Sequence, residues 1–129
     1  MRIKIKWEIG IKVLVCGDRN WTNVDLIRRW LIRLKDSGYT IVIEGEAHGA
    51  DTIARNLAEE MNLEVLRFPA NWKKFHKAAG SIRNTQMLDE GKPDLILAFH
   101  NNIENSKGTK NMISQAKKRD INIILIAEN

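Results

Sequence analysis

The sequence has a single cysteine, Cys16, and no apolar run that approaches the roughly 20 residues needed to cross a bilayer. One cysteine excludes a disulfide framework and favours a reducing compartment. Residues 1–9 are basic but lack the continuous apolar stretch of a signal peptide. Repeats, low-complexity segments and linkers are also missing, and 129 residues fit one ordinary domain. We therefore expect a cytoplasmic, single-domain protein with no membrane partner.

The net charge is +5, but basic and acidic residues are concentrated in different parts of the chain. Residues 1–40 carry nine Lys or Arg against four acidic residues, whereas residues 41–66 carry one against six. A nucleic-acid-binding protein usually presents a basic stripe with few interruptions. Nucleic acid is thus a less favoured partner than a small molecule, and solvated helix faces explain the basic blocks equally well.

Five short apolar runs rich in β-branched residues are typical of strands buried on both faces. They cover residues 12–16, 40–43, 64–68, 94–99 and 122–126. Amphipathic stretches between them predict helices that begin at a capping box of Thr22 and Asp25, at Ala50, at Ser81 and at Thr109. This alternation predicts an α/β, three-layer Rossmann-like domain over residues 11–129, with a mainly parallel sheet of about five strands and helices on both faces.

The N-terminal extension, residues 1–10, has a different pattern. Apolar residues alternate with charged residues from Arg2 to Ile9, which predicts an extra strand with one exposed face, at an edge or a subunit contact. An unstructured tail is the alternative.

In an open parallel sheet, ligands bind beyond the carboxyl ends of the strands, so the loops after the strands hold the candidate site. In the first loop, Gly17 allows close backbone approach and Arg19 is suited to pair with phosphate. Trp21 is suited either to stack on a base or to pack on the following helix. Asp18 lies beside them as a ligand-binding candidate or an ordinary turn residue.

The second loop has Gly45 and Gly49 directly before a predicted helix that starts at Ala50. Free backbone N–H groups and the helix dipole at such a start bind anions, although no Lys-Ser or Lys-Thr follows to make a P-loop. Asp51 is equally suited to cap the helix and to bind a ribose. Glu44 and Glu46 place acid–base groups beside this position and are the catalytic candidates.

The third and fourth loops add cations and a second helix start. Residues 69–80 form a long aromatic and basic segment that includes Trp72 and is suited to be a lid. Arg83 and Asn84 follow at a predicted helix start, where a cation favours an anionic partner. Gly108 and Thr109 begin the last predicted helix and could form the second side of an anion cradle.

Taken jointly, these motifs resemble a known family. The matching residues are Val15-Cys16-Gly17-Asp18-Arg19-x-Trp21, Gly45-x-Ala47-x-Gly49-Ala50-Asp51, Phe68-Pro69-Ala70-x-Trp72, Lys77-Ala78-Ala79-Gly80-x-x-Arg83-Asn84-x-x-Met87, Pro93-Asp94-Leu95-x-Leu97-Ala98-Phe99 and Gly108-Thr109-x-x-Met112. The chain, apart from residues 1–9, resembles the YspA, or cpYpsA-related, branch of the SLOG superfamily. The resemblance implies a five-stranded Rossmann-like sheet and a ligand related to nucleotides. The superfamily includes the Lonely Guy phosphoribohydrolases, the single-stranded-DNA-binding DprA and proposed sensor domains, and this branch often occurs in phages or mobile elements.

Two departures from the pattern concern catalysis. The hydrolases carry a catalytic glutamate after the Gly-Thr pair, where this sequence has Met112. The branch usually has glycine where this chain has Glu46. We therefore expect a binder of a nucleotide-like phosphate ligand, acting as sensor or sequestering protein, without a metal or cofactor. A hydrolase that cleaves the N-glycosidic bond of nucleoside monophosphates is the first alternative, and a single-stranded nucleic-acid binder is the second. The protein could form a homodimer.

Overall fold

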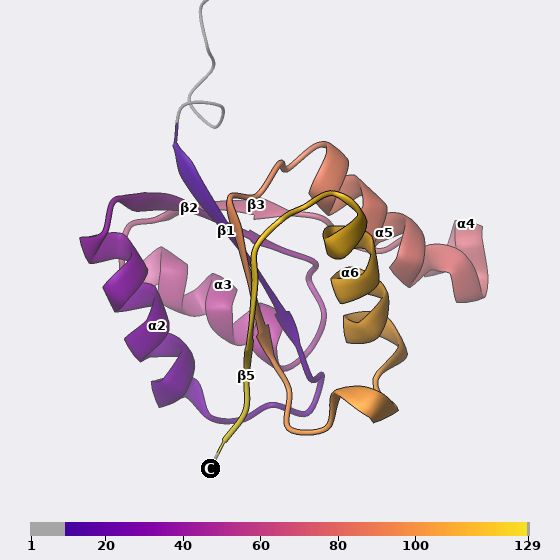
Figure 1. Ribbon diagram of the computed structural model, residues 1–129, viewed down its shortest axis with the longest axis horizontal. Helices are drawn as coiled ribbons and strands as arrows, with labels where there is room; N and C mark the ends of the chain where they lie inside the picture. The colour runs from indigo at the N-terminus through magenta and orange to yellow at the C-terminus, as the bar shows by residue number, and fades with distance from the viewer. Residues whose placement is uncertain (1–9, 129) are drawn as a thin grey trace, which may run out of the picture.

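The computed structural model describes residues 10–128, in which strands and helices alternate along the chain (Figure 1). The strands are β1 (Ile11–Gly17), β2 (Tyr39–Glu44), β3 (Glu64–Arg67), β4 (Leu95–Phe99) and β5 (Ile123–Ile126). The α-helices are α2 (Val24–Asp36), α3 (Ala50–Glu60), α4 (Trp72–Phe75), α5 (Ala79–Asp89) and α6 (Lys107–Lys118). Two short 3₁₀ segments are η1 (His76–Ala78) and η2 (Ile103–Asn105). The strand predicted within residues 1–9 lies outside the described residues.

The five strands form one parallel sheet in the order β3-β2-β1-β4-β5. This confirms the predicted α/β Rossmann-like fold. The order reverses between β1 and β4, because the chain builds outward from β1 to one edge and then returns to β4 on the other side. The carboxyl ends of β1 and β4 therefore frame the crevice where ligands bind in folds of this kind.

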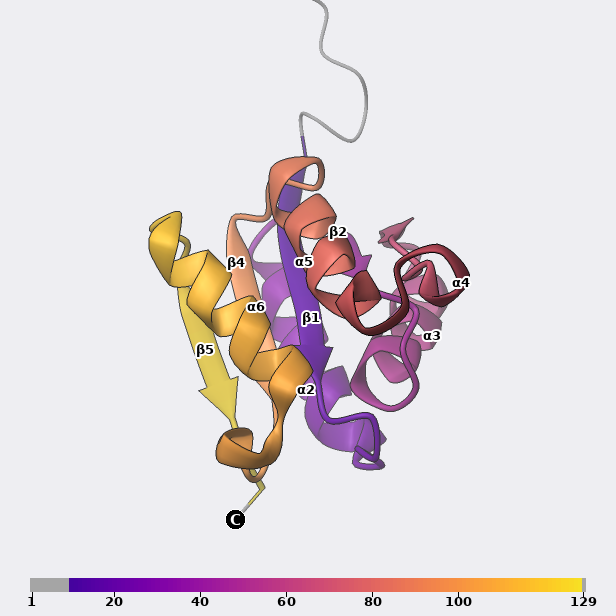
Figure 2. The ribbon, with the colours of Figure 1, turned by 90° about the vertical axis from the view of Figure 1, so that its right-hand side faces the viewer.

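Alternate residues of β1 face opposite layers of the molecule. Val13 and Val15 pack in one apolar cluster with α2 and α3, whereas Leu14 and Cys16 pack in another with α5 and α6. Figure 2 shows α5 and α6 in front of the sheet and α2 and α3 behind it. The near-continuous apolarity of the strand is thus explained by burial on both faces, and the three-layer arrangement is as predicted.

The helix starts differ from the predictions where a capping residue was misjudged. Asn23, rather than Thr22, caps α2, because its side chain accepts a hydrogen bond from the Leu26 amide at 3.0 Å. Ser106 caps α6 through the Thr109 amide at 3.1 Å, so that helix begins at Lys107. Any of Ser, Thr, Asn or Asp can cap a helix, and competition between neighbours decides which one does.

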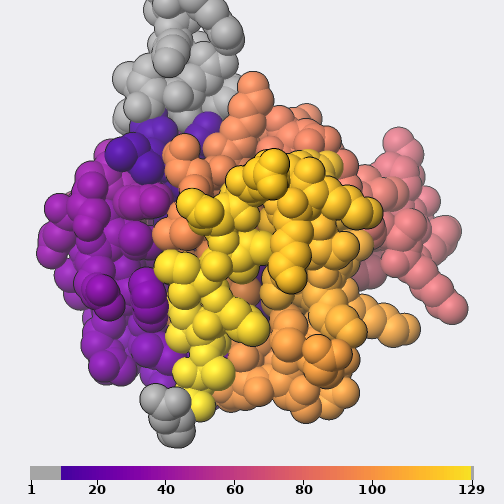
Figure 3. All heavy atoms as spheres, viewed as in Figure 1, coloured from indigo at the N-terminus to yellow at the C-terminus, as the bar shows by residue number. Residues whose placement is uncertain are grey.

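The segment 69–80 is not the long loop that the sequence predicted. It contains α4 and η1, and α5 then begins at Ala79, two residues before the predicted start. Asn71 caps α4 by accepting a hydrogen bond from the Lys74 amide at 3.0 Å. In Figures 1 and 3 this segment projects from the side of the molecule. No helix in the described part of the chain is long and apolar enough to cross a membrane.

Candidate functional site

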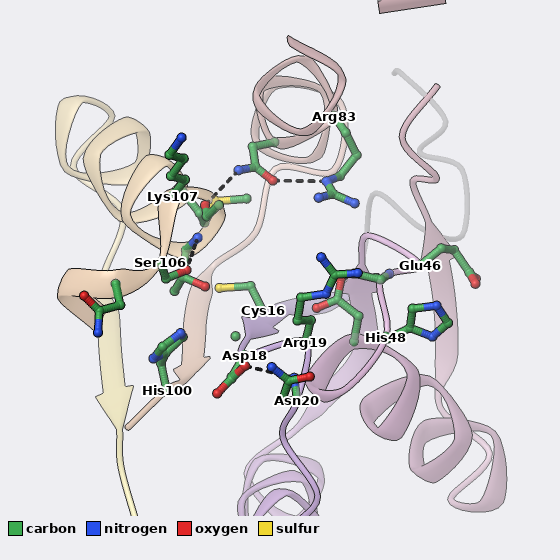
Figure 4. Close-up of a pocket in the computed structure, with 18 of the residues that line it drawn as sticks. Cys16, Asp18, Arg19, Asn20, Glu46, His48, Arg83, His100, Ser106 and Lys107 are labelled. Carbon is green, nitrogen blue, oxygen red and sulfur yellow. Dashed lines mark hydrogen bonds between the residues drawn. The ribbon is translucent and has the colours of Figure 1, made fainter. Parts of the chain in front are cut away.

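A cavity of about 960 Å³ opens at the carboxyl ends of β1 and β4. Most of the ligand-binding candidates line it: Gly17, Asp18, Arg19, Asp51, Trp72, Arg83, Asn84, Gly108 and Thr109. Figure 4 shows His100, Ser106 and Lys107 on one side, Glu46 and His48 on the other, and Arg83 from α5 above them. The remaining candidates, Trp21, Gly45, Gly49, Ala50 and Glu44, lie outside the lining.

The first loop is tied to the end of β4. The Asp18 amide donates to the Phe99 carbonyl at 2.8 Å, and the Asp18 carboxylate accepts from the Asn20 amide at 2.9 Å. These bonds hold the turn and leave Arg19 exposed on the cavity wall. Within residues 10–128, Arg19 has neither a hydrogen bond nor an ion pair, so its guanidinium is available to an anion.

Trp21 packs in the core, which corrects its candidacy as a base-stacking residue. Its side chain is 4% exposed and meets Phe99 edge-on, with 5.6 Å between ring centroids. The indole N–H donates to the Asn23 carbonyl at 2.9 Å. The apolar body and the polar tip of the ring are both already partnered, so no face remains for a base.

The second loop presents fewer amides to a ligand than the sequence suggests, because an internal carboxylate occupies two of them. The Asp51 carboxylate accepts hydrogen bonds through Oδ2 from the Gly45 amide at 3.1 Å and from the Ala47 amide at 3.3 Å. The Ala50 amide donates to the Asp18 carbonyl at 3.2 Å. A Cβ at Gly49 would overlap the backbone of Asp18 and Arg19, and a Cβ at Gly45 would lie 2.6 Å from Arg83 Nη1.

Asp51 is 5% exposed and lines the cavity. Burial raises the pKa of its carboxyl to about 6, against the opposing effects of Arg83 and of the two amides that donate to it. Its second oxygen, Oδ1, accepts no hydrogen bond from the residues that the structure describes. One half of the carboxylate thus holds the loop, and the other half is free on the cavity side.

The two catalytic candidates on this loop are already engaged elsewhere. Glu46 pairs with Arg55 at 2.6 Å and with Arg67 at 3.4 Å. Glu44, at the end of β2, is 0% exposed and does not line the cavity. The pKa of Glu44 is raised to about 8, chiefly by burial and also by the Glu46 carboxyl, against the opposing effect of the Glu46 amide that donates to it. Neither carboxylate is therefore placed as a free acid or base for a substrate in the cavity.

Arg83 is held by acceptors that carry no net charge. Its Nη1 donates to the Gly45 carbonyl at 2.5 Å, and its Nε donates to the Asn84 side chain at 3.1 Å. No carboxylate of residues 10–128 lies within ion-pair distance of it. It is the fifth residue of α5 and lies beyond the first turn. The prediction that the helix dipole at this position favours an anionic partner for Arg83 therefore does not hold.

Asn84 joins the two helices that flank the cavity. Its amide nitrogen donates to the Gly108 carbonyl at 3.2 Å and to the Asn111 side chain at 3.1 Å, while its oxygen accepts from Arg83. The side chain is 4% exposed and all of its polar atoms that can reach the cavity are occupied. Asn84 thus fixes Arg83 relative to the start of α6.

The start of α6 forms the opposite wall. Ser106 uses its hydroxyl for the cap, so the Thr109 hydroxyl makes no hydrogen bond to any described residue. An added Cβ on Gly108 would meet no atom within 4 Å, because that residue faces open space. The Lys107 side chain adds a positive charge on the same wall. This wall combines a helix start, a hydroxyl and a positive charge, which is the kind of position that suits an anion.

Several cavity residues were not candidates from the sequence. Cys16 and Met87 line it beside Met112, whose place in the site the family pattern had indicated, and burial raises the pKa of the Cys16 thiol far above its usual range. His100 also lines it, directly after β4. The position of His100 after a predicted strand was a usable signal. No pattern in the sequence indicated that Cys16 and Met87 converge on Met112.

Trp72 lines the cavity from α4 and is 59% exposed. Its ring and the Arg83 guanidinium flank Gly80, where an added Cβ would be 3.5 Å from the ring and 3.9 Å from Nη2. An exposed aromatic ring beside a guanidinium is suited to a ligand that carries both a planar group and an anion. No group of His, Cys, Asp and Glu suited to a metal ion occurs among the described residues.

The comparisons with known proteins concern the family and the fold. The model of the YspA, cpYpsA-related SLOG family matches residues 11–75, which are half of the 129 residues. The chain belongs to this SLOG family. Among solved structures, the SLOG chain is similar to DNA processing protein A (DprA) from Streptococcus pneumoniae, with a TM-score of 0.76 and 14% identity over 95% of this chain and 52% of that chain. It spans about half the length of that protein, and a likeness at this identity shows the fold alone. No curated protein is a significant match.

Proposed function

We propose that the cavity binds a nucleotide or a nucleotide-derived phosphate ligand, and that the protein acts as a sensor or sequestering protein for it. One observation carries the proposal: the Arg83 guanidinium lies in the cavity wall, fixed by the Gly45 carbonyl and the Asn84 side chain, without a carboxylate of the described residues within ion-pair distance. The charge of a partly buried cation that is held by neutral acceptors can be neutralised by a bound anion. The guanidinium group is well matched to phosphate in shape and charge.

The opposite wall supports the same ligand. The Thr109 hydroxyl and the exposed backbone at Gly108 lie at the positive end of α6, and Lys107 adds charge there. Arg19 contributes a further cation, unpaired among the described residues, from the first loop. A phosphate between these walls would be contacted by donors from several elements, while Trp72 offers an aromatic face for a base. A volume of about 960 Å³ accommodates a ligand of nucleotide size.

The geometry favours binding over N-glycosidic hydrolysis. Glu46 is paired with two arginines and Glu44 lies beneath the loop, outside the cavity. Met112 lines the cavity where the related hydrolases are expected to carry a glutamate. Glycosidic cleavage needs acid–base groups beside the scissile bond. We therefore propose binding as the function and leave hydrolysis as an outcome to be measured.

Replacing Arg83 tests the proposal. We expect the protein to be stabilised thermally by at least one of AMP, GMP, CMP, UMP, ADP-ribose or a cyclic dinucleotide, because a ligand that binds only the folded state raises Tm. Arg83→Gln should weaken binding of that ligand roughly tenfold to a hundredfold, since it removes charge-assisted hydrogen bonds. Isothermal titration calorimetry gives the affinities, and the same samples can be assayed for released base.

Arg29→Gln is the matched control, because Arg29 is exposed on α2 and pairs only with Asp25 at 3.6 Å among the described residues. It should leave the affinity unchanged within about twofold, as expected for a surface ion pair. Stabilisation by none of these phosphorylated compounds would count against the proposed function. A steep loss of affinity for single-stranded oligonucleotides with salt, without small-molecule binding, would favour the nucleic-acid alternative.

A further inference from the structure

The proposed function leaves one buried group of the cavity without a role, namely the free oxygen of Asp51. The side chain is 5% exposed, and Oδ2 is already used by the Gly45 and Ala47 amides. Those two bonds fix the plane of the carboxylate. Asp51 lines the cavity, and Oδ1 has no donor from the residues that the structure describes. Oδ1 is not among the buried polar atoms that lack a partner, so it is accessible and can accept a hydrogen bond from a ligand.

The backbone places this acceptor beside the proposed phosphate contact. Arg83 donates to the Gly45 carbonyl at 2.5 Å, and the amide of the same Gly45 donates to Asp51 at 3.1 Å. A single residue thus joins the cation and the carboxylate along one wall. A phosphate group satisfies Arg83 but is repelled by Asp51. A ligand that satisfies both must carry an anionic group and, close to it, a neutral hydrogen-bond donor.

We propose that Asp51 accepts a hydrogen bond from a ribose hydroxyl of the ligand, which makes the ligand a ribonucleoside phosphate with a free 2′ or 3′ hydroxyl. In a 5′-phosphorylated ribose, the anion and these hydroxyls belong to one sugar, which matches the neighbouring positions of Arg83 and Asp51. This inference rests on the proposed function, because it assumes that a phosphate ester occupies the cavity. It adds recognition of one ribose hydroxyl to that function.

The hydroxyl can be removed from the ligand without altering the protein. For whichever of AMP, GMP, CMP and UMP binds most tightly, we expect the 2′-deoxy or the 3′-deoxy form to bind the wild-type protein roughly tenfold more weakly. This is the loss expected when a hydrogen bond to a buried charged acceptor cannot form. Calorimetry with the full chain gives the ratio. The ratio does not depend on whether an Asp51 variant folds.

Asp51→Asn assigns the effect to this residue. An asparagine can keep an oxygen toward the Gly45 and Ala47 amides while an NH₂ group replaces Oδ1, so the loop retains its acceptor. In this variant the hydroxyl can only accept from a neutral NH₂ group, and a neutral hydrogen bond contributes less than one to a charged acceptor, so the preference for the hydroxyl should fall to within about twofold. Asp25→Asn is the control, because Asp25 lies on α2 outside the cavity lining and its carboxylate pairs with Arg29 at 3.6 Å. The control should keep the tenfold ratio.

The possible results separate this inference from the function on which it rests. If no phosphate ester binds in an Arg83-dependent way, the proposed function fails and the inference fails with it. If a ribonucleotide and both of its deoxy forms bind equally, the function stands and the role of Asp51 is overturned. A tenfold ratio that persists in Asp51→Asn also overturns it, because the charged acceptor is then not what favours the hydroxyl.

Discussion

Replacing Gly49 by alanine is expected to destabilise the protein by about 3 to 5 kcal/mol and to lower its Tm by about 10 °C or more. Gly49 is the N-cap of α3 and has φ 76° and ψ −125°, a conformation that is strained for residues with a Cβ. A Cβ there would also lie 2.6 Å from the Arg19 carbonyl oxygen and would overlap the Asp18 carbonyl. Both neighbours are backbone atoms of the first loop, so neither can move away without displacing the cavity wall. Thermal and urea unfolding measure the loss.

Gly108→Ala is the matched control for this prediction. Gly108 lies in the first turn of α6, and an added Cβ meets no atom within 4 Å. Because alanine favours a helix over glycine by about 0.5 to 1 kcal/mol, this variant should be as stable as the wild type or slightly more stable. A Gly49→Ala protein that unfolds together with Gly108→Ala would show that the loop relaxes freely.

The second loop shows which features of the site could be predicted from the sequence and which could not. Two glycines before a helix predicted an anion site at the second loop, and the helix does begin at Ala50. The sequence could not show that Asp51 folds back onto the Gly45 and Ala47 amides, because that depends on side-chain direction within the first turn. The Asp51 carboxylate therefore accepts from two of the amides that the motif predicted to face a phosphate.

The fold itself was largely predictable because it depends on burial. β1 and β4 are buried on both faces, and their continuous apolarity marked them clearly in the sequence. Segments stabilised by local polar contacts were harder to predict. α4 depends on one Asn71 cap, and α6 begins two residues before the predicted start because Ser106 competes successfully as the cap. Alternative caps differ by small free energies, and the pattern of apolar residues gives no information about which cap is preferred.

Glu44 shows a further limit of the sequence. It was a catalytic candidate, yet its position at the end of β2 buries it fully. Oε1 accepts from the Glu46 amide at 2.8 Å, whereas Oε2 and the Glu46 Oε1 atom are buried without a hydrogen-bond donor among the described residues. The raised pKa of Glu44 agrees with a protonated carboxyl in the native protein, and the Glu46 Oε1 atom lies 3.4 Å from Arg67 Nε. Glu44 therefore affects folding stability through the proton that it binds.

Stability should therefore fall as pH rises, and Glu44→Gln should remove part of that fall. The native protein keeps a proton on Glu44 up to a pKa of about 8, whereas the unfolded chain releases it near the ordinary value of 4.5. Because the native state binds more protons between these values, the free energy of unfolding decreases across this range and is lowest above pH 8. Glutamine keeps the acceptor and the donor of the protonated acid. We expect equal stability of the two proteins near pH 4.5, and an advantage of about 3 kcal/mol for Glu44→Gln at pH 9.

Urea unfolding between pH 5 and 9 measures the difference between the two proteins. Asp51 also has a raised pKa, of about 6, so its own loss of stability is complete near pH 7 and is common to both proteins. The range from pH 7 to 9 therefore isolates Glu44. Glu104→Gln is the control, since its exposed carboxylate pairs only with Lys110 at 3.3 Å among the described residues, and its curve should run parallel to that of the wild type. Parallel curves for Glu44→Gln as well would mean that Glu44 is ionised in the native protein at neutral pH, with its charge balanced by the arginines around Glu46.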